Sequence, residues 1–177
     1  SNKSVNANSS CQATLADYTG DVSASDNCDA SPVVTQSPVA GSTITGTTNV
    51  VLTVSDASGN TSSTPFEVTV IDVTNPTISS LSNKSINGNT NCQAVLADYT
   101  GDVSASDNCD AAPIVTQSPV AGSTITGITT VTLTVTDASG NTAETMFDVS
   151  LADAIAPEIT CSSDLVVTSL TSEIVDY

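Results

Sequence analysis

The sequence has no histidine, arginine or tryptophan, and it contains few aromatic residues. Two lysines stand against 19 acidic residues among 177, so the formal net charge is −17 at pH 7. Binding to a nucleic-acid backbone depends on Lys and Arg, so this composition argues against a nucleic-acid partner. The missing histidine, together with the lack of a Ser/His/Asp or Cys/His set and of a Gly-rich phosphate loop, argues against an enzyme.

Long apolar runs are also missing. No stretch approaches the roughly 18 apolar residues that a membrane-spanning helix needs, so we expect no direct insertion into a membrane. A chain this acidic repels itself unless cations neutralise it. The charge therefore indicates either bound divalent cations or a surface that simply keeps the protein soluble.

The feature that dominates the sequence is an internal repeat. A shift of 81 residues aligns the chain with itself without gaps and gives 56 identical positions among 80 compared. A period this long is typical of whole domains in tandem, because repeats that must stack to bury a core usually have about 20 to 50 residues. We predict one repeat over 1–75, a second over 76–156 and the opening of a third, incomplete one over 157–177. The chain is therefore expected to be part of a longer array.

Within a repeat, apolar residues alternate with polar ones and Gly, Asn, Asp and Pro interrupt the pattern, which predicts strands rather than helices. The clearest strand runs from Asn49 to Asp56, and a second leads through Phe66 to Asp72, so that the two form a hairpin. Shorter strands are predicted around Val5, over 12–17, over 32–36 and at Ile44. Six or seven short strands in about 80 residues predict an all-β fold, namely tandem immunoglobulin-like β-sandwich domains.

Paired cysteines recur in the repeat and favour an oxidising, extracellular compartment. A hairpin centred on Thr19 and Gly20 would place Cys11 opposite Cys28, and Cys92 opposite Cys109 in the second copy. We therefore predict a disulfide within each repeat, which would stabilise it by about 3 kcal/mol; buried free thiols are the alternative. The fifth cysteine, Cys161, is expected to pair further along the array.

The two lysines, Lys3 and Lys84, occupy equivalent positions in the opening strand of each repeat. A lysine on an edge strand discourages edge-to-edge pairing of sheets, which is the plain interpretation. An intramolecular isopeptide bond with a neighbouring Asn is the alternative.

Several motifs resemble those of the hyalin repeat (HYR) family. They are Asp26-Asn27-Cys28-Asp29, Pro32, Val34-Thr35-Gln36, Gly41, Asp56-Ala57-Ser58-Gly59-Asn60, Asp72 and Pro76, and both copies carry the pattern. The resemblance implies an immunoglobulin-like domain used in extracellular adhesion, similar to those in large surface proteins of gliding or host-associated Bacteroidetes. Hyalin repeats often have two further cysteines that the full repeats here lack, and Cys161 restores the first of them.

Clusters of carboxylate and amide side chains recur in the loops, and calcium prefers six to eight oxygen ligands of these kinds. In an immunoglobulin-like sandwich two of the loops share one end, which the preceding linker also enters, so we expect the clusters to meet between domains. The Asp56 to Asn60 motif is equally suited to an ordinary hairpin turn. If Cys11 pairs with Cys28, the sites could instead be split within and between domains. The predicted calcium ligands are Asp26, Asn27, Asp29, Asp56, Asn60, Asp72, Asp107, Asn108, Asp110, Asp137, Asn141 and Asp153.

These features predict a spacer in the stalk of an extracellular adhesin or surface filament, made rigid by calcium at the joints and by disulfides within the domains. Its partners would be neighbouring repeats of the same chain. The alternative is a calcium-dependent module that binds a surface glycan or a protein. An ice-binding face of threonines, suggested by Thr43, Thr45, Thr47 and Thr48, is a third and weaker possibility, because threonine is common on any exposed strand.

Overall fold

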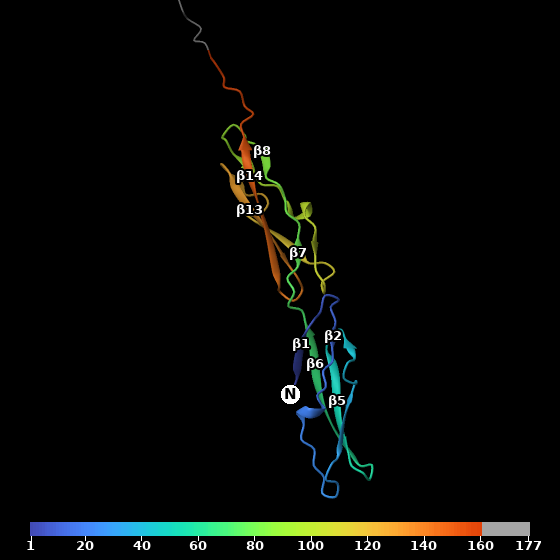
Figure 1. Cartoon of the computed structure of the whole chain (residues 1–177). Coiled ribbons are helices and arrows are strands. Elements are labelled where there is room, and N and C mark those ends of the chain that lie inside the picture. The colour runs from blue at the N-terminus through green and yellow to red at the C-terminus, as the bar shows by residue number, and fades with distance from the viewer. Residues whose placement is uncertain (161–177) are drawn as a thin grey trace, which may run out of the picture.

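The computed structural model describes residues 1–160 and shows an elongated, all-β molecule made of two units placed end to end (Figure 1). Two short 3-10 turns, η1 (Thr19–Asp21) and η2 (Thr100–Asp102), are the helical segments of the described residues. The expected all-β fold of tandem immunoglobulin-like sandwiches is thereby confirmed. Among the described residues, none belongs to a helix long and apolar enough to cross a membrane.

The first unit has one four-stranded sheet and one small sheet. The strand order of the larger sheet is β1-β6-β5-β3, and β2 pairs with β4 in the other. β5 and β6 form the long antiparallel hairpin, whereas β1 runs parallel to β6. The strands are β1 (Lys3–Asn6), β2 (Ala13–Thr14), β3 (Val33–Ser37), β4 (Thr43–Ile44), β5 (Thr48–Ser55) and β6 (Thr61–Ile71).

The second unit repeats this arrangement and adds one strand pair. Its large sheet has the order β11-β13-β14-β8, β12 pairs with β9, and β10 pairs with β7. The strands are β7 (Thr77–Ile78), β8 (Lys84–Asn87), β9 (Ala94–Val95), β10 (Ala105–Ser106), β11 (Ile114–Ser118), β12 (Thr124–Ile125), β13 (Thr129–Thr136) and β14 (Thr142–Ala152).

The cores lie between the large and small sheets of each unit, as the alternation of side chains predicts. Val50 and Val131 are fully buried on equivalent strands, and Leu15 and Leu96 cover them from the opposite layer. In each unit one Tyr meets one Phe edge to face, with ring centroids 5.2 Å apart in the first unit and 5.1 Å in the second. Edge-to-face pairs add to the gain from burial alone, which helps a core this poor in aromatic residues.

The two cores differ at the end where β7 lies. Val135 is fully buried in the second unit, whereas its equivalent Val54 is only half-buried in the first. Ile78 and Leu81 pack against the second core. The first unit instead has an open depression there, lined by Ala24, Leu52 and Val54 among others.

The lysines form ion pairs with aspartates beside the 3-10 turns. Lys3 Nζ lies 2.7 Å from Asp21 Oδ2, and Lys84 Nζ lies 3.5 Å from Asp102 Oδ2. The hydrogen bond to Asp21 is the main reason why the pKa of Lys3 is raised. The lysines therefore form ion pairs with aspartates, and the neighbouring asparagine of the alternative prediction is not their partner.

Candidate metal centre at the joint between the units

Asp107 begins the first of two loops that meet at the joint. Its Oδ2 accepts hydrogen bonds from the backbone N–H groups of Cys109 (2.8 Å) and Asp110 (3.0 Å). A short acidic side chain that accepts bonds from the following backbone is a common way to hold a tight turn. Because both bonds go to Oδ2, the other oxygen, Oδ1, remains buried and has no hydrogen-bond partner.

Asp137 begins the second loop, between β13 and β14. Its Oδ1 accepts bonds from the backbone N–H groups of Ser139 (2.9 Å) and Asn141 (2.8 Å), and its Oδ2 accepts one from the Asn141 side chain (2.8 Å). Burial tends to raise the pKa of Asp137, which is 5% exposed, but the bonds from Asn141, Ser139 and Gly140 outweigh it and the pKa is lowered. The carboxylate is therefore held in its charged form.

Asp72 reaches the joint from the first unit, directly after β6. Its Oδ1 accepts the backbone N–H of Thr74 (3.0 Å), and its backbone oxygen accepts the side-chain amide of Asn141 (3.3 Å). The second carboxylate oxygen, Oδ2, is buried without a partner. Asn108 completes the set: its amide nitrogen donates to the backbone oxygen of Asn8 (3.0 Å), which leaves its Oδ1 buried and unpartnered as well.

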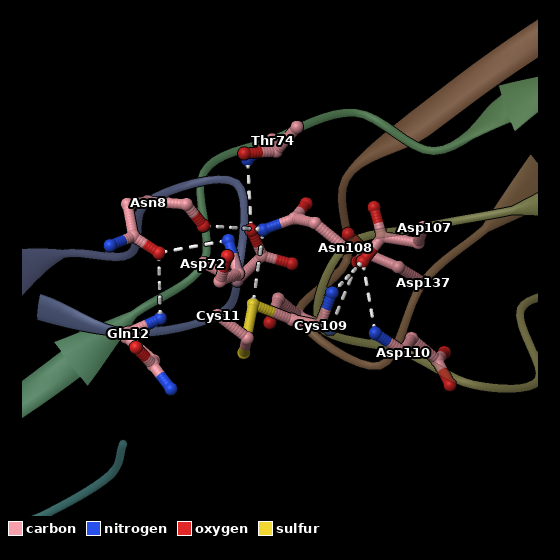
Figure 2. Close-up of a disulfide and its surroundings, with 12 residues drawn as sticks. Asn8, Cys11, Gln12, Asp72, Thr74, Asp107, Asn108, Cys109, Asp110 and Asp137 are labelled. Atoms are coloured by element: carbon pink, nitrogen blue, oxygen red, sulfur yellow. Dashed lines mark hydrogen bonds between the residues drawn. A yellow bond between two sulfur atoms is a disulfide. The ribbon is translucent and has the colours of Figure 1, made fainter. Parts of the chain in front are cut away.

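These side chains converge on one point (Figure 2). One carboxylate oxygen from each of Asp72, Asp107 and Asp137 lies within 4.8 Å of the others. Among the described residues, the buried side-chain atoms that lack a hydrogen-bond partner are Asp72 Oδ2, Asp107 Oδ1 and Asn108 Oδ1, and all three belong to this cluster. Buried polar atoms are almost always paired, so three orphaned oxygens on residues that meet at one joint need an explanation.

Asp110 is among the predicted calcium ligands, but its carboxylate binds backbone N–H groups of the loops. Its Oδ1 accepts the backbone N–H of Ala112 (2.9 Å) and its Oδ2 accepts that of Ala138 (2.9 Å). Both oxygens are thus used to tie one loop to the other. Asp29 binds Ser31 and Ala57 in the same way in the first unit. We therefore interpret both residues as braces that hold the loops together.

The remaining predicted ligands lie at the two outer ends of the molecule. Asp26, Asp56 and Asn60 line one small depression at the free end of the first unit, so the Asp26 to Asp29 loop does meet the hairpin turn. The pKa of Asp56 is lowered chiefly by the hydrogen bond from the Asn60 side chain. Asn27 is exposed beside Cys28, and Asp153 is exposed at the far end of the second unit.

A disulfide crosses the joint. It connects Cys11 of the first unit to Cys109 of the second (Figure 2), with a Cα–Cα distance of 4.9 Å. Cys28 and Cys92 are exposed free thiols. The predicted pairs, Cys11 with Cys28 and Cys92 with Cys109, are therefore wrong. Cys161 lies outside the described residues.

The reason for this error is the path of the chain after Cys11. Thr19 and Gly20 lie in the 3-10 turn η1 and not at the tip of a hairpin, so the chain continues along the sandwich instead of doubling back. The Cys11 loop is held beside the end of β6, where Ala7 N donates to Ile71 O (2.8 Å), while Cys28 lies near the start of β6. The 11 residues of β6 span roughly 35 Å, which is far too long for a disulfide.

Two contributors to the joint were missed by sequence reasoning. Asn8 holds the Cys11 loop with its side chain, which accepts bonds from the backbone of Ser10 and Gln12, and its backbone oxygen accepts the amide of Asn108. Cys11 itself adopts a positive φ of 56°. The repetition of Asn8 and Cys11 as Asn89 and Cys92 was visible in the sequence, but a pattern that recurs in every repeat does not reveal whether its contacts lie within one repeat or between two.

Comparison with protein families finds a match that covers the second unit. Residues 71–151 match the model of the HYR domain. A search of curated proteins finds no match. Solved structures that resemble the chain include PcdhgB3 EC1-4, with 13% identity, a TM-score of 0.35 and coverage of 86% of this chain and 49% of the other. The human desmocollin-1 ectodomain has 17% identity, a TM-score of 0.26 and coverage of 65% and 24%. The chain thus spans at most about half the length of these relatives, and the HYR domain is the family that its second unit resembles.

Proposed function

We propose that the chain is a spacer of an extracellular, adhesion-type surface protein, and that calcium bound between the two units holds them at a fixed angle. The observation that carries this proposal is the group of three buried oxygens without partners at the joint. Asp72 and Asp137 come from different units, so an ion between them would link the units directly. Proposed ligands are Asp72, Asp107, Asn108 and Asp137.

The chemistry of these donors favours calcium over other metals. All are carboxylate or amide oxygens, which suit hard cations such as Ca²⁺, and the set contains no imidazole or thiolate of the kind that zinc or copper prefers. The cysteine beside the cluster, Cys109, is already bonded to Cys11. Ligands drawn from two loops and the linker also fit the irregular coordination that calcium tolerates and magnesium does not.

Charge balance points the same way. Three carboxylates lie together at the joint, and both lysines of the chain are engaged elsewhere, with Asp21 and Asp102. Like charges this close disfavour one another unless a cation intervenes. A bound divalent ion would convert the repulsion between the units into an attraction.

The elongated shape suits the role of a spacer. The two units lie end to end (Figure 1). The 11-residue strand β6 alone spans roughly 35 Å at the usual rise per residue. The match of residues 71–151 to the HYR domain supports an extracellular, adhesive setting. A stalk of such units would carry a binding domain away from the cell surface.

The first test compares the whole chain in calcium and in excess chelator. We expect calcium to raise the melting temperature and to keep the particle long and rigid in small-angle X-ray scattering. Removal of calcium should shorten the average particle and broaden its distance distribution. If calcium changes neither quantity, the joint does not bind calcium, and a glycan- or protein-binding role becomes the better hypothesis.

The repeat supplies a matched pair of variants. Asp107→Asn keeps an oxygen for the bonds from Cys109 and Asp110 but replaces Oδ1, the proposed ligand, with an amide nitrogen. Asp26→Asn makes the same change at the equivalent, exposed position of the first unit, away from the joint. We expect D107N to lower calcium affinity at the joint by tenfold or more in calorimetry, and D26N to leave it within about twofold. Equal effects of the two would contradict the proposed site.

A further inference from the structure

The disulfide at the joint closes a covalent loop that contains most of the first unit. Cys11 and Cys109 are 98 positions apart in the sequence, so residues 12–108 lie inside this loop. The strands from β2 to β10 and the linker after Ile71 belong to it. Of the described strands, β1 and β11 to β14 lie outside. The shortest covalent path along the molecule therefore runs from β1 through the disulfide into β11.

Without the disulfide, two short parallel strand pairs would bear a pull on the chain. In the first unit the entering strand β1 pairs with the leaving strand β6 at four positions, from Lys3 with Val68 to Asn6 with Ile71. In the second unit β8 pairs with β14 in the same way, again at four positions. The long strands run along the axis of the molecule (Figure 1), so a pull on its two ends shears these pairs. Parallel pairs are slightly less stable per residue than antiparallel ones.

With the disulfide in place, the same pull leaves β1 at Cys11 and enters the second unit at Cys109. The strands β6 and β8 and the linker between them are bypassed, because they lie in the closed loop. The load then reaches β14 through two antiparallel ladders, β11 with β13 at five positions and β13 with β14 at eight. It therefore moves from four-residue parallel pairs to longer antiparallel ones.

The first unit needs little change for this path to become taut. β1 is an extended strand, and Ala7, directly after it, donates its backbone N–H to Ile71 O (2.8 Å) at the end of β6. Cys11 follows four residues later, at the joint. A pull along the axis therefore tightens the segment from β1 to Cys11 and leaves the rest of the sandwich folded beside it.

We propose that the Cys11–Cys109 disulfide carries tension across the joint and bypasses the linker and the parallel strand pair of each unit. The proposal deepens the role of a spacer, because a spacer in a stalk is pulled at both ends, but the load path itself does not depend on calcium. One consequence does rest on the proposed calcium site: the ligands Asp72, Asp107 and Asn108 all lie in the bypassed loop. The stalk would thus bear tension without pulling these ligands apart.

The test stretches the whole chain between handles at its two ends, in chelator, so that failure of calcium binding cannot affect it. The background protein, with Cys28→Ser, Cys92→Ser and Cys161→Ser, keeps the disulfide, and a second form also carries Cys11→Ser and Cys109→Ser.

The number and size of the unfolding steps identify the two forms. Without the disulfide we expect two steps, from residues 3–71 and 84–152, each of which releases roughly 240 Å of chain at about 3.5 Å per residue. With the disulfide we expect one step, from residues 110–152, which releases roughly 150 Å.

The rate at which the second unit unfolds under constant force decides the proposal, because forced unfolding follows the unfolding rate. We expect the disulfide to slow this step at least tenfold more under force than it slows unfolding of the same unit in urea without force. The comparison with urea removes any general stabilisation by the disulfide. A slowing that force leaves unchanged would overturn the proposal.

A pair of proline variants tests which contact bears the load in the first unit. Because Ala7 N faces β6, alternation along the strand makes Val5 N face it too, whereas Ser4 N points away from the edge of the sheet. Without the disulfide, Val5→Pro should speed unfolding of the first unit under force by tenfold or more, and Ser4→Pro by less than about twofold. With the disulfide, neither should change the single step by more than about twofold. If V5P speeds unfolding equally in both forms, the load crosses the joint through β6 and the proposal fails.

Discussion

Single polar residues decide much of the stability of cores that contain so few aromatic side chains. Gln117 shows this most clearly: its Oε1 accepts the backbone N–H of Tyr99 (2.8 Å), and its Nε2 donates to the backbone oxygens of Ala97 and Pro119 (3.0 Å each). Gln36 makes the same three bonds in the first unit. One side chain thus fixes the segment that carries the tyrosine into the core.

Gln117→Ala should therefore destabilise the second unit by about 2 to 4 kcal/mol, because three backbone groups lose their partners at roughly 1 kcal/mol each. Urea denaturation followed by circular dichroism measures this loss. Gln93→Ala is the control, since its side chain makes none of the hydrogen bonds found among the described residues. A loss below about 1 kcal/mol for Q117A would show that water replaces these bonds.

Stability in acid should depend on Asp17 and Asp98, which sit before the 3-10 turns. The backbone N–H of Thr100, and then its hydroxyl, lower the pKa of Asp98, and Thr19 does the same for Asp17. Because the pKa is lowered in the folded state, these carboxylates stabilise the fold fully above the ordinary carboxyl pKa of 3.8. Their stabilisation of the fold is lost as the pH falls below that value. In chelator, the melting temperature of a D17N/D98N variant should fall less steeply between about pH 5 and pH 2 than that of the parent. An identical slope would contradict this assignment.

At the scale of elements, the loop from Asn8 to Gln12 is the connection that the joint depends on. It positions Cys11 for the disulfide and gives a backbone oxygen to Asn108. The disulfide keeps the loops of the second unit against the end of β6, where Asp72 lies. Covalent restraint and metal binding should therefore reinforce one another, because each reduces the freedom that the other must overcome.

Removal of the disulfide should weaken calcium binding while leaving both sandwiches folded. We expect Cys11→Ser with Cys109→Ser, in a background where Cys28, Cys92 and Cys161 are also serine, to lower calcium affinity by roughly tenfold in calorimetry. Far-UV circular dichroism should be unchanged, because each unit keeps its own core. The background protein with Cys11 and Cys109 intact is the control, and equal affinities would show that the joint is preformed without the disulfide.

At the scale of the whole molecule, a net charge of −17 opposes close packing of the two units. Salt screens such repulsion over about 10 Å at 0.1 M. In chelator, raising sodium chloride from about 10 to 150 mM should therefore raise the melting temperature. With calcium bound the same salt change should have a smaller effect, and a larger effect there would contradict neutralisation at the joint.

The sequence by itself determined the long hairpin strands, their buried faces and the order of the two repeats, but it gave no sign of the short pair β7 and β10. These features follow from short-range alternation, which the local burial of Val50, Leu52 and Val131 satisfies directly. It also singled out the acidic residues that meet at the joint. Such patterns could be recognised because each one lies within a few consecutive residues.

Only the tertiary structure decided which partners meet across the joint. In a repeat, Cys109 and Cys28 carry the same local signal, so a bond from Cys11 to either fits the sequence equally well. The 3-10 turn at Thr19–Asp21 carries Cys28 to the opposite end of the sandwich, and the end-to-end placement of the units brings Cys109 to Cys11 instead. Asp107 keeps one carboxylate oxygen without a hydrogen bond, whereas both oxygens of Asp110 accept one. This difference depends on the geometry of the loops, which the spacing of the residues in the sequence does not reveal.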